Sequence, residues 1–186
     1  FFRYQTKRYA KDIEAMRDTI DLSTFHSIID VGCGTGALCG VLADLNLEVT
    51  GIDQAEKMLA VARKKATRNN ITFQEANVLQ GLPFPDNQFD IAIASYVAHG
   101  MGREQRKTLY AEMSRIAKHL VIFHDYNENR SILTSLVEWL EGGDYFYFIK
   151  HAETEMRECL TEMKRCFKQV EVYQIAERAN WYICTP

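Results

Sequence analysis

The chain has 186 residues, 47% of them hydrophobic and 25% charged, which is typical of one ordinary globular domain. Its net charge of −3 excludes the overall basic field that accompanies nucleic-acid binding, so no nucleic-acid partner is expected. No apolar run is long enough to cross a bilayer, and we expect no membrane partner. The five cysteines form no Cys-x-x-Cys pair, which argues against a disulfide framework or a metal site and favours free thiols in the cytoplasm.

Hydrophobic periodicity divides the chain into alternating helices and strands. Helices are predicted over residues 7–20, 37–45, 55–68, 104–118, 132–140 and 152–166. Strands are predicted over residues 27–31, 48–53, 71–76, 89–95, 119–124, 168–175 and 179–184. Such alternation favours parallel pairing with helices on both faces, whereas the short connection between the last two strands allows only a hairpin. The sequence therefore predicts an α/β fold: a doubly wound, mostly parallel, Rossmann-like seven-stranded sheet with an antiparallel C-terminal hairpin strand.

We expect one domain over residues 1–186, in which residues 1–25 form an N-terminal helical cap and residues 127–166 a helical lid. The latter segment contains two glycines followed by four aromatic residues, among them Tyr145 and Tyr147. It fits either a mobile lid that lines an apolar acceptor pocket or an aromatic anchor that packs helices onto the sheet. Because the first residue is Phe1 rather than Met, the numbering is expected to begin inside a longer protein.

A glycine-rich turn, Asp30-Val31-Gly32-Cys33-Gly34-Thr35-Gly36, joins the first predicted strand to the following helix. Glycines let the backbone approach a ligand, and the helix points free N–H groups at whatever occupies the turn. The spacing Gly32-x-Gly34-x-x-Ala37 also fits a nicotinamide dinucleotide. Asp30 separates the alternatives, because its carboxylate would repel a pyrophosphate but attract the ammonium and sulfonium groups of S-adenosylmethionine. We therefore expect S-adenosylmethionine as the cofactor.

Asp53 ends the second predicted strand, where an acidic side chain can accept hydrogen bonds from both ribose hydroxyls of such a cofactor. The alternative is a helix cap, since Asp53-x-x-Glu56 resembles a capping box. The two roles are compatible through different atoms of the carboxylate.

Three segments together carry a family resemblance: residues 29–36, residues 51–53 with Met58 following, and Leu82-Pro83-Phe84-Pro85-Asp86-Asn87-Gln88-Phe89-Asp90. On these motifs, within residues 27–123, the chain resembles a class I S-adenosylmethionine-dependent methyltransferase of the small-molecule type that includes the ubiquinone and menaquinone biosynthesis enzymes. The motifs are specific for the cofactor and say little about the methyl acceptor.

The resemblance implies that S-adenosylmethionine lies over the glycine loop and leaves as S-adenosylhomocysteine. With Asp30 added on electrostatic grounds, the predicted cofactor contacts are Asp30, Gly32, Cys33, Gly34, Gly36, Asp53, Gln54, Met58, Asn77, Val78, Ser95 and Tyr96. Asn77 departs from the acidic residue that relatives often place against the adenine amino group, although its side-chain oxygen can still accept a hydrogen bond. For Met58, core packing is the competing interpretation.

Methyl transfer from a sulfonium is an in-line displacement, so the protein has to align donor and acceptor in a dry site and, where needed, remove a proton. The predicted proton acceptors are His99 and His124, although lone histidines at strand ends are commonly structural. They also invite a metal interpretation, but no closely spaced ligand set supports it. The predicted substrate pocket comprises Tyr4, Tyr9, Asp125, Tyr126, Tyr145 and Tyr147.

The sequence thus predicts an S-adenosylmethionine-dependent methyltransferase that acts on a small-molecule acceptor, at oxygen, nitrogen or carbon. An NAD(P)-dependent oxidoreductase is the first alternative, disfavoured by Asp30, by the terminal hairpin and by the lack of room for a substrate domain. A non-catalytic S-adenosylmethionine-binding module is the second, because catalysis by alignment requires few obligatory side chains. The oligomeric state stays open.

Overall fold

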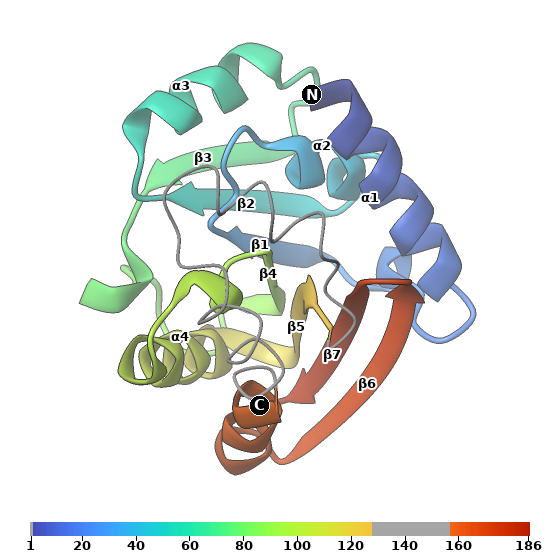
Figure 1. Ribbon diagram of the computed structural model, residues 1–186. Helices are drawn as coiled ribbons and strands as arrows, with labels where there is room; N and C mark the ends of the chain where they lie inside the picture. The colour runs from blue at the N-terminus through green and yellow to red at the C-terminus, as the bar shows by residue number, and fades with distance from the viewer. Residues whose placement is uncertain (1, 128–156) are drawn as a thin grey trace, which may run out of the picture.

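The computed structural model of the chain describes residues 2–127 and 157–186 (Figure 1). The predicted helix over residues 132–140, Tyr145, Tyr147 and most of the predicted lid therefore lie outside the described residues. In the part that is described, no helix combines the length and the apolar character that crossing a membrane requires.

One seven-stranded sheet organises the chain, with strand order β3-β2-β1-β4-β5-β7-β6 (Figure 1). The strands are β1 (Ser27–Val31), β2 (Glu48–Asp53), β3 (Ile71–Glu75), β4 (Phe89–Ser95), β5 (Ala117–Tyr126), β6 (Gln169–Ala176) and β7 (Ala179–Thr185). The first five pair in parallel, whereas β7 runs antiparallel to both β5 and β6. This confirms the predicted fold class, including the C-terminal hairpin.

Helices cover both faces of the sheet, as a doubly wound fold requires (Figure 1). Their bounds are α1 (Phe2–Met16), α2 (Ala37–Ala43), α3 (Glu56–Lys65) and α4 (Arg103–Ile116), with short 3-10 turns η1 (Leu22–Thr24), η2 (Val78–Gln80) and η3 (Ala98–Gly100). Residues 157–166 are also helical. Successive side chains of a strand point to opposite faces, so Ile28 packs with α1, α2 and α3, while Ile29 packs with α4.

The first helix and the fifth strand differ most in extent from their predictions, while α2, α3 and α4 end two or three residues earlier than predicted. The first helix covers residues 2–16 rather than 7–20, because residues 17–19 form a turn and the Asp21 side chain accepts a hydrogen bond from the Ser23 amide at the start of η1. Strand β5 is longer than predicted because it pairs along both edges: Ala117 lies opposite Phe89 of β4, and Tyr126 lies opposite Ala179 of β7. Pairing partners extend a strand beyond its own hydrophobic run.

Two glycines near the site provide a matched test of this packing. A Cβ atom built on Gly51 in β2 would lie 2.8 Å from the Cys39 sulfur and 2.8 Å from Phe73, whereas a Cβ on Gly40 in α2 meets no atom of the described part of the chain within 4 Å. We predict that Gly51→Ala lowers the free energy of unfolding by about 1–3 kcal/mol through overpacking. The control, Gly40→Ala, should raise it by about 0.5–1 kcal/mol, because alanine loses less backbone entropy in a helix. Urea unfolding measures both, and equal effects of the two changes would contradict this packing.

Candidate active site

The turn between β1 and α2 passes through left-handed backbone, with φ of 79° at Gly32, 53° at Gly34 and 75° at Gly36. The amides of Gly32 and Cys33 both donate to the Ile52 carbonyl, at 2.8 and 2.9 Å, which ties the turn to the end of β2. A Cβ on Gly32 would lie 2.7 Å from Val97. Left-handed backbone and close packing together require glycine here.

Asp53 fastens the same turn to the beginning of α3. Its Oδ2 accepts a hydrogen bond from the Gly34 amide and its Oδ1 accepts one from the Ala55 amide, both at 2.9 Å. The predicted capping box with Glu56 is absent, since α3 has Ala55 at its N-cap without a side-chain capping bond. Each carboxylate oxygen has a further lone pair, so the loop contacts leave the predicted ribose role available.

A cavity of about 420 Å³ opens at the carboxyl ends of β1 and β4, between the glycine turn and α1. The sequence-predicted site residues that line it are Tyr4, Tyr9, Asp30, Gly32, Cys33, Gly34, Met58, Ser95, Tyr96 and Tyr126. This is the position where open α/β sheets bind ligands. Met58 is 41% exposed with its methyl group facing Gly34, so the core-packing interpretation of this residue is wrong.

Other predicted residues lie outside the cavity lining: Gly36, Asp53, Gln54, Asn77, Val78, His99, His124 and Asp125. Gly36 ends the turn at the N-cap of α2, where a Cβ would come within 3.0 Å of Ala62 and Phe73. Val78 is buried in the core, and the Asn77 side-chain oxygen accepts a hydrogen bond from the Leu79 amide at 2.9 Å. That bond caps η2 and occupies one of the two lone pairs of the oxygen that was predicted to face the adenine.

Sequence reasoning missed two polar residues of α1 that line the cavity, Gln5 and Arg8. Arg8 Nη2 donates to the Tyr96 hydroxyl at 2.6 Å, and the guanidinium lies 5.4 Å from the centre of that ring. The Gln5 Oε1 atom is buried and has no hydrogen-bond partner within the described part of the chain. The available signal was helical spacing, because residues four apart lie on one face of a helix, and Gln5 and Arg8 each stand four residues from a predicted pocket tyrosine.

Asp30 is 1% exposed, and its Oδ2 lies 3.3 Å from the Cys39 thiol, which donates to it. Burial raises the pKa of Asp30 to about 7, an effect that the thiol hydrogen bond partly opposes. A cation in the cavity would favour the charged form of this carboxyl group. Asp30 lines the cavity, so its carboxylate would be within reach of a cation bound there.

The two predicted proton acceptors lie in different environments, and His124 is enclosed. Its side chain is 1% exposed, with Nδ1 3.1 Å from Ser95 Oγ and Nε2 3.7 Å from Asp12 Oδ2. Burial lowers the pKa of His124 to about 4. A ring that is so enclosed has no access to a methyl acceptor, so its burial contradicts the idea that His124 removes the acceptor's proton.

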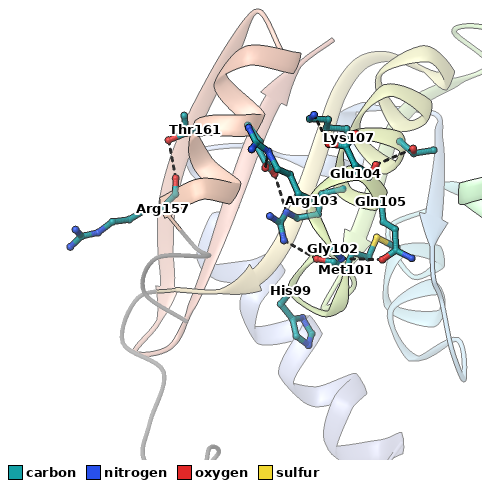
Figure 2. Close-up of polar contacts among 12 residues, drawn as sticks. His99, Met101, Gly102, Arg103, Glu104, Gln105, Lys107, Arg157 and Thr161 are labelled. Atoms are coloured by element: carbon teal, nitrogen blue, oxygen red, sulfur yellow. Dashed lines mark hydrogen bonds and ion pairs between the residues drawn. The ribbon is translucent and has the colours of Figure 1, made fainter. Parts of the chain in front are cut away.

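His99 is partly open, with 27% of its side chain exposed, and it pairs with a buried carboxylate. Its Nδ1 lies 2.9 Å from Asp125 Oδ1, and its backbone amide donates to Oδ2 at 3.1 Å. Figure 2 shows the imidazole pointing away from the turn that Met101, Gly102 and Arg103 form at the start of α4. The ring lies 4.9 Å from Tyr126 and 6.5 Å from Tyr96, both of which line the cavity.

Comparison with known proteins extends these observations. A family profile described as a methyltransferase domain matches residues 28–119. An uncharacterized methyltransferase of Bacillus licheniformis is 24% identical over 170 residues, which cover 88% of this chain and 77% of that protein. A demethylmenaquinone methyltransferase of Shouchella clausii is 37% identical over 123 residues, which cover 61% of this chain and 48% of that protein.

The chain belongs to the class I S-adenosylmethionine-dependent methyltransferases. Its cofactor is accordingly S-adenosylmethionine. A protein of Pyrococcus horikoshii has the same fold, with a TM-score of 0.70 at 19% identity, covering 94% of this chain and 89% of that one. A SAM-dependent methyltransferase from Aquifex aeolicus has a TM-score of 0.69 at 16% identity, covering 94% of this chain and 90% of that one. The chain spans 43% and 32% of two further curated methyltransferases that it matches.

The raised pKa of Asp30 predicts a pH-dependent affinity of this methyltransferase for its cofactor product. An ammonium group binds the carboxylate form, which is lost as the pH falls through about 7 in the free protein. Calorimetric affinity for S-adenosylhomocysteine should therefore fall between pH 7.5 and 5.5, by up to about tenfold per unit below the pKa. Asp30→Asn should bind weakly throughout with a flat profile. A variant that kept the wild-type slope would refute the assignment of this titration to Asp30.

Proposed function

We propose that this domain binds S-adenosylmethionine with its methionine end between Asp30 and Arg8, and that it transfers the methyl group to a small organic acceptor. The observation that carries the proposal is that the walls of one cavity include an acidic and a basic side chain. Asp30 comes from the end of β1, and Arg8 comes from α1. The amino acid end of the cofactor carries an ammonium and a carboxylate, which such walls complement.

The residues that line the cavity fit this cofactor in further ways. Gln5 Oε1 has no hydrogen-bond partner among the described residues, and it can accept a hydrogen bond from the ammonium group or a ribose hydroxyl. Gly34 opens the backbone towards the ligand, since among the described residues a Cβ there would meet only Met58, at 3.9 Å. A pyrophosphate at the same place would face the Asp30 carboxylate, which disfavours a nicotinamide dinucleotide. Asp53 and Gln54 remain our proposed ribose and adenine-side contacts, together with Asn77 and Val78.

The bound cofactor would supply a methyl group activated by its sulfonium. The chain would contribute alignment and exclusion of water, because Tyr4, Tyr9 and Arg8 of α1 cover the cavity while Ser95 and Tyr96 border it from β4. Ser95 Oγ donates to the Tyr9 hydroxyl at 3.2 Å, and Arg8 bonds Tyr96, so α1 is held against the strand ends. A small acceptor is supported by relatives named demethylmenaquinone methyltransferase and ubiquinone biosynthesis O-methyltransferase. Free cysteines fit a cytoplasmic location.

Arg8→Gln tests the charged cradle. Loss of one charge-assisted hydrogen bond of about 1.5–3 kcal/mol should raise the Kd for S-adenosylhomocysteine by roughly 10–150-fold. Binding of 5′-methylthioadenosine, which lacks the amino acid end, should change little. Lys7→Gln on the exposed side of α1 is the matched control and should leave both affinities unchanged. Calorimetry measures the affinity of each of the two variants for each of the two ligands. An equal loss of affinity for both ligands in Arg8→Gln would show that Arg8 merely supports the fold.

Activity itself is tested by release of S-adenosylhomocysteine from S-adenosylmethionine in the presence of phenols, quinols, amines and thiols. Release that requires an acceptor supports the proposal. Tight cofactor binding without transfer to any of them would favour a non-catalytic module, and NADH binding in the absence of S-adenosylmethionine binding would favour an oxidoreductase.

A further inference from the structure

We propose that α1 and α3 form a basic surface that binds acidic phospholipids and turns the mouth of the cofactor cavity towards the bilayer. The proposal goes beyond the methyltransferase function and starts from the uneven distribution of charge over the chain. Together α1 and α3 contain eight basic and three acidic residues, a net charge of +5, although the net charge of the whole chain is −3. The other residues therefore carry a net charge of −8.

The first step is the exposure of the cations on these two helices. The exposed cations that make up the basic surface are Arg3, Lys7 and Lys11 of α1 and Lys57, Lys64 and Lys65 of α3. Arg63 is left out because its charge is paired with Glu56. Within residues 2–127 and 157–186, Lys57 and Lys64 form no ion pair, so their charge is available to a partner.

The second step is the presence of exposed apolar side chains among these cations. Tyr4 is 67% exposed, Met58 41% and Val61 36%. In the described part of the chain one other large apolar side chain is exposed, that of Val172 in β6. Exposed apolar groups therefore concentrate on the same two helices as the positive charge, and this combination is typical of helices that lie on a bilayer.

The third step is the position of the two helices relative to each other and to the cavity. Lys65 Nζ of α3 lies 4.2 Å from the centre of the Phe2 ring, and the beginning of α1 lies next to α3 (Figure 1). Tyr4 of α1 and Met58 of α3 both line the cofactor cavity. Residues three apart share one face of a helix, so Val61 lies on the same side of α3 as Met58. The basic surface therefore flanks the cavity.

The chemistry of this surface favours a bilayer with acidic headgroups. Clusters of four to eight lysines and arginines on amphipathic helices attract such a bilayer, and each cation strengthens binding about fivefold. Met58 and Val61 favour lipid over nucleic acid, because an aliphatic side chain can insert between headgroups but offers no ring on which a base could stack.

Contact of this kind is peripheral. Our expectation of no membrane partner rested on the lack of an apolar run that spans a bilayer, and binding to the surface of a bilayer needs none. With the basic surface on the headgroups, the cofactor cavity would open towards the lipid, because α1 and α3 both contribute to its lining.

Co-sedimentation of the whole chain with vesicles tests the surface without cofactor or acceptor. The protein should bind phosphatidylcholine vesicles that contain about one third phosphatidylglycerol at least about tenfold more tightly than vesicles of phosphatidylcholine alone. Raising the NaCl concentration from about 0.1 M to about 0.5 M should release the protein, because salt screens these charges. Equal binding to the two kinds of vesicle would overturn the proposal.

A double substitution on α3, Lys57→Gln with Lys64→Gln, removes two charges of the basic surface and should weaken binding to the acidic vesicles by about 30-fold. The matched control, Lys164→Gln with Lys168→Gln, removes two exposed charges beside Met163, which packs with α4 on the other face of the sheet. It should change binding by less than about twofold, because charge acts on a bilayer over about one Debye length. Equal losses in the two double variants would overturn the assignment to α1 and α3.

The apolar part of the surface is tested by Val61→Ser, which should weaken binding to acidic vesicles about three- to tenfold through lost insertion. Val172→Ser changes the exposed valine of β6 and should leave binding unchanged. Equal effects of the two valine changes would overturn the insertion of Val61.

Two further measurements separate the alternatives. A single-stranded RNA that bound the wild-type protein more tightly than the vesicles, and lost affinity in the double variant of α3, would assign this surface to nucleic acid and overturn the proposal. All variants should keep the wild-type affinity for S-adenosylhomocysteine, which shows that they fold. Failure of the wild-type protein to bind S-adenosylmethionine or S-adenosylhomocysteine would overturn the proposed function, and the vesicle result would still decide the lipid surface.

Discussion

The left-handed turn after β1 is the constraint on which the rest of the site depends. The turn can pass through Gly32, Gly34 and Gly36 only because these positions carry no side chain. Its amides bond to the end of β2, both through the Ile52 carbonyl and through the Asp53 carboxylate. The turn is therefore held from the neighbouring strand, which keeps the cavity open beside the Asp30 carboxyl group. A turn of ordinary residues would occupy that space itself.

Burial determines the electrostatics on both sides of this cavity. Burial raises the pKa of Asp30 and also that of Asp12, and it lowers the pKa of His124. Asp12 and His124 lie where α1 meets the ends of the strands, 3.7 Å apart. Arg8 is the cation at this junction that also reaches the cavity, through its bond to Tyr96. In the proposed binding mode, Arg8 of α1 would supply the positive charge for the carboxylate end of the cofactor.

Sequence patterns predicted the sheet well because the relevant information is local. A short apolar run of strand length followed by a turn is consistent with a buried strand, and β1, β2 and β4 have the predicted bounds. The extents of α1 and β5 were predicted less well. Their ends depend on partners distant in the sequence, such as the pairing of Tyr126 with Ala179. Local propensity carries no information about such partners.

The sequence by itself determined the order of helices and strands along the chain, the glycine turn and the acidic residue ahead of that turn. Each of these features depends on residues that are adjacent along the chain. Only the tertiary structure decided which polar side chains share the cavity. Arg8 and Gln5 enter the site because α1 packs across the strand ends, and no motif marks them. The two histidines look equivalent in the sequence, yet β7 and α1 bury His124 while η3 leaves His99 partly open beside Asp125. Exposure and partners arise from packing between distant segments, so the chemical role of a histidine is a property of the folded chain.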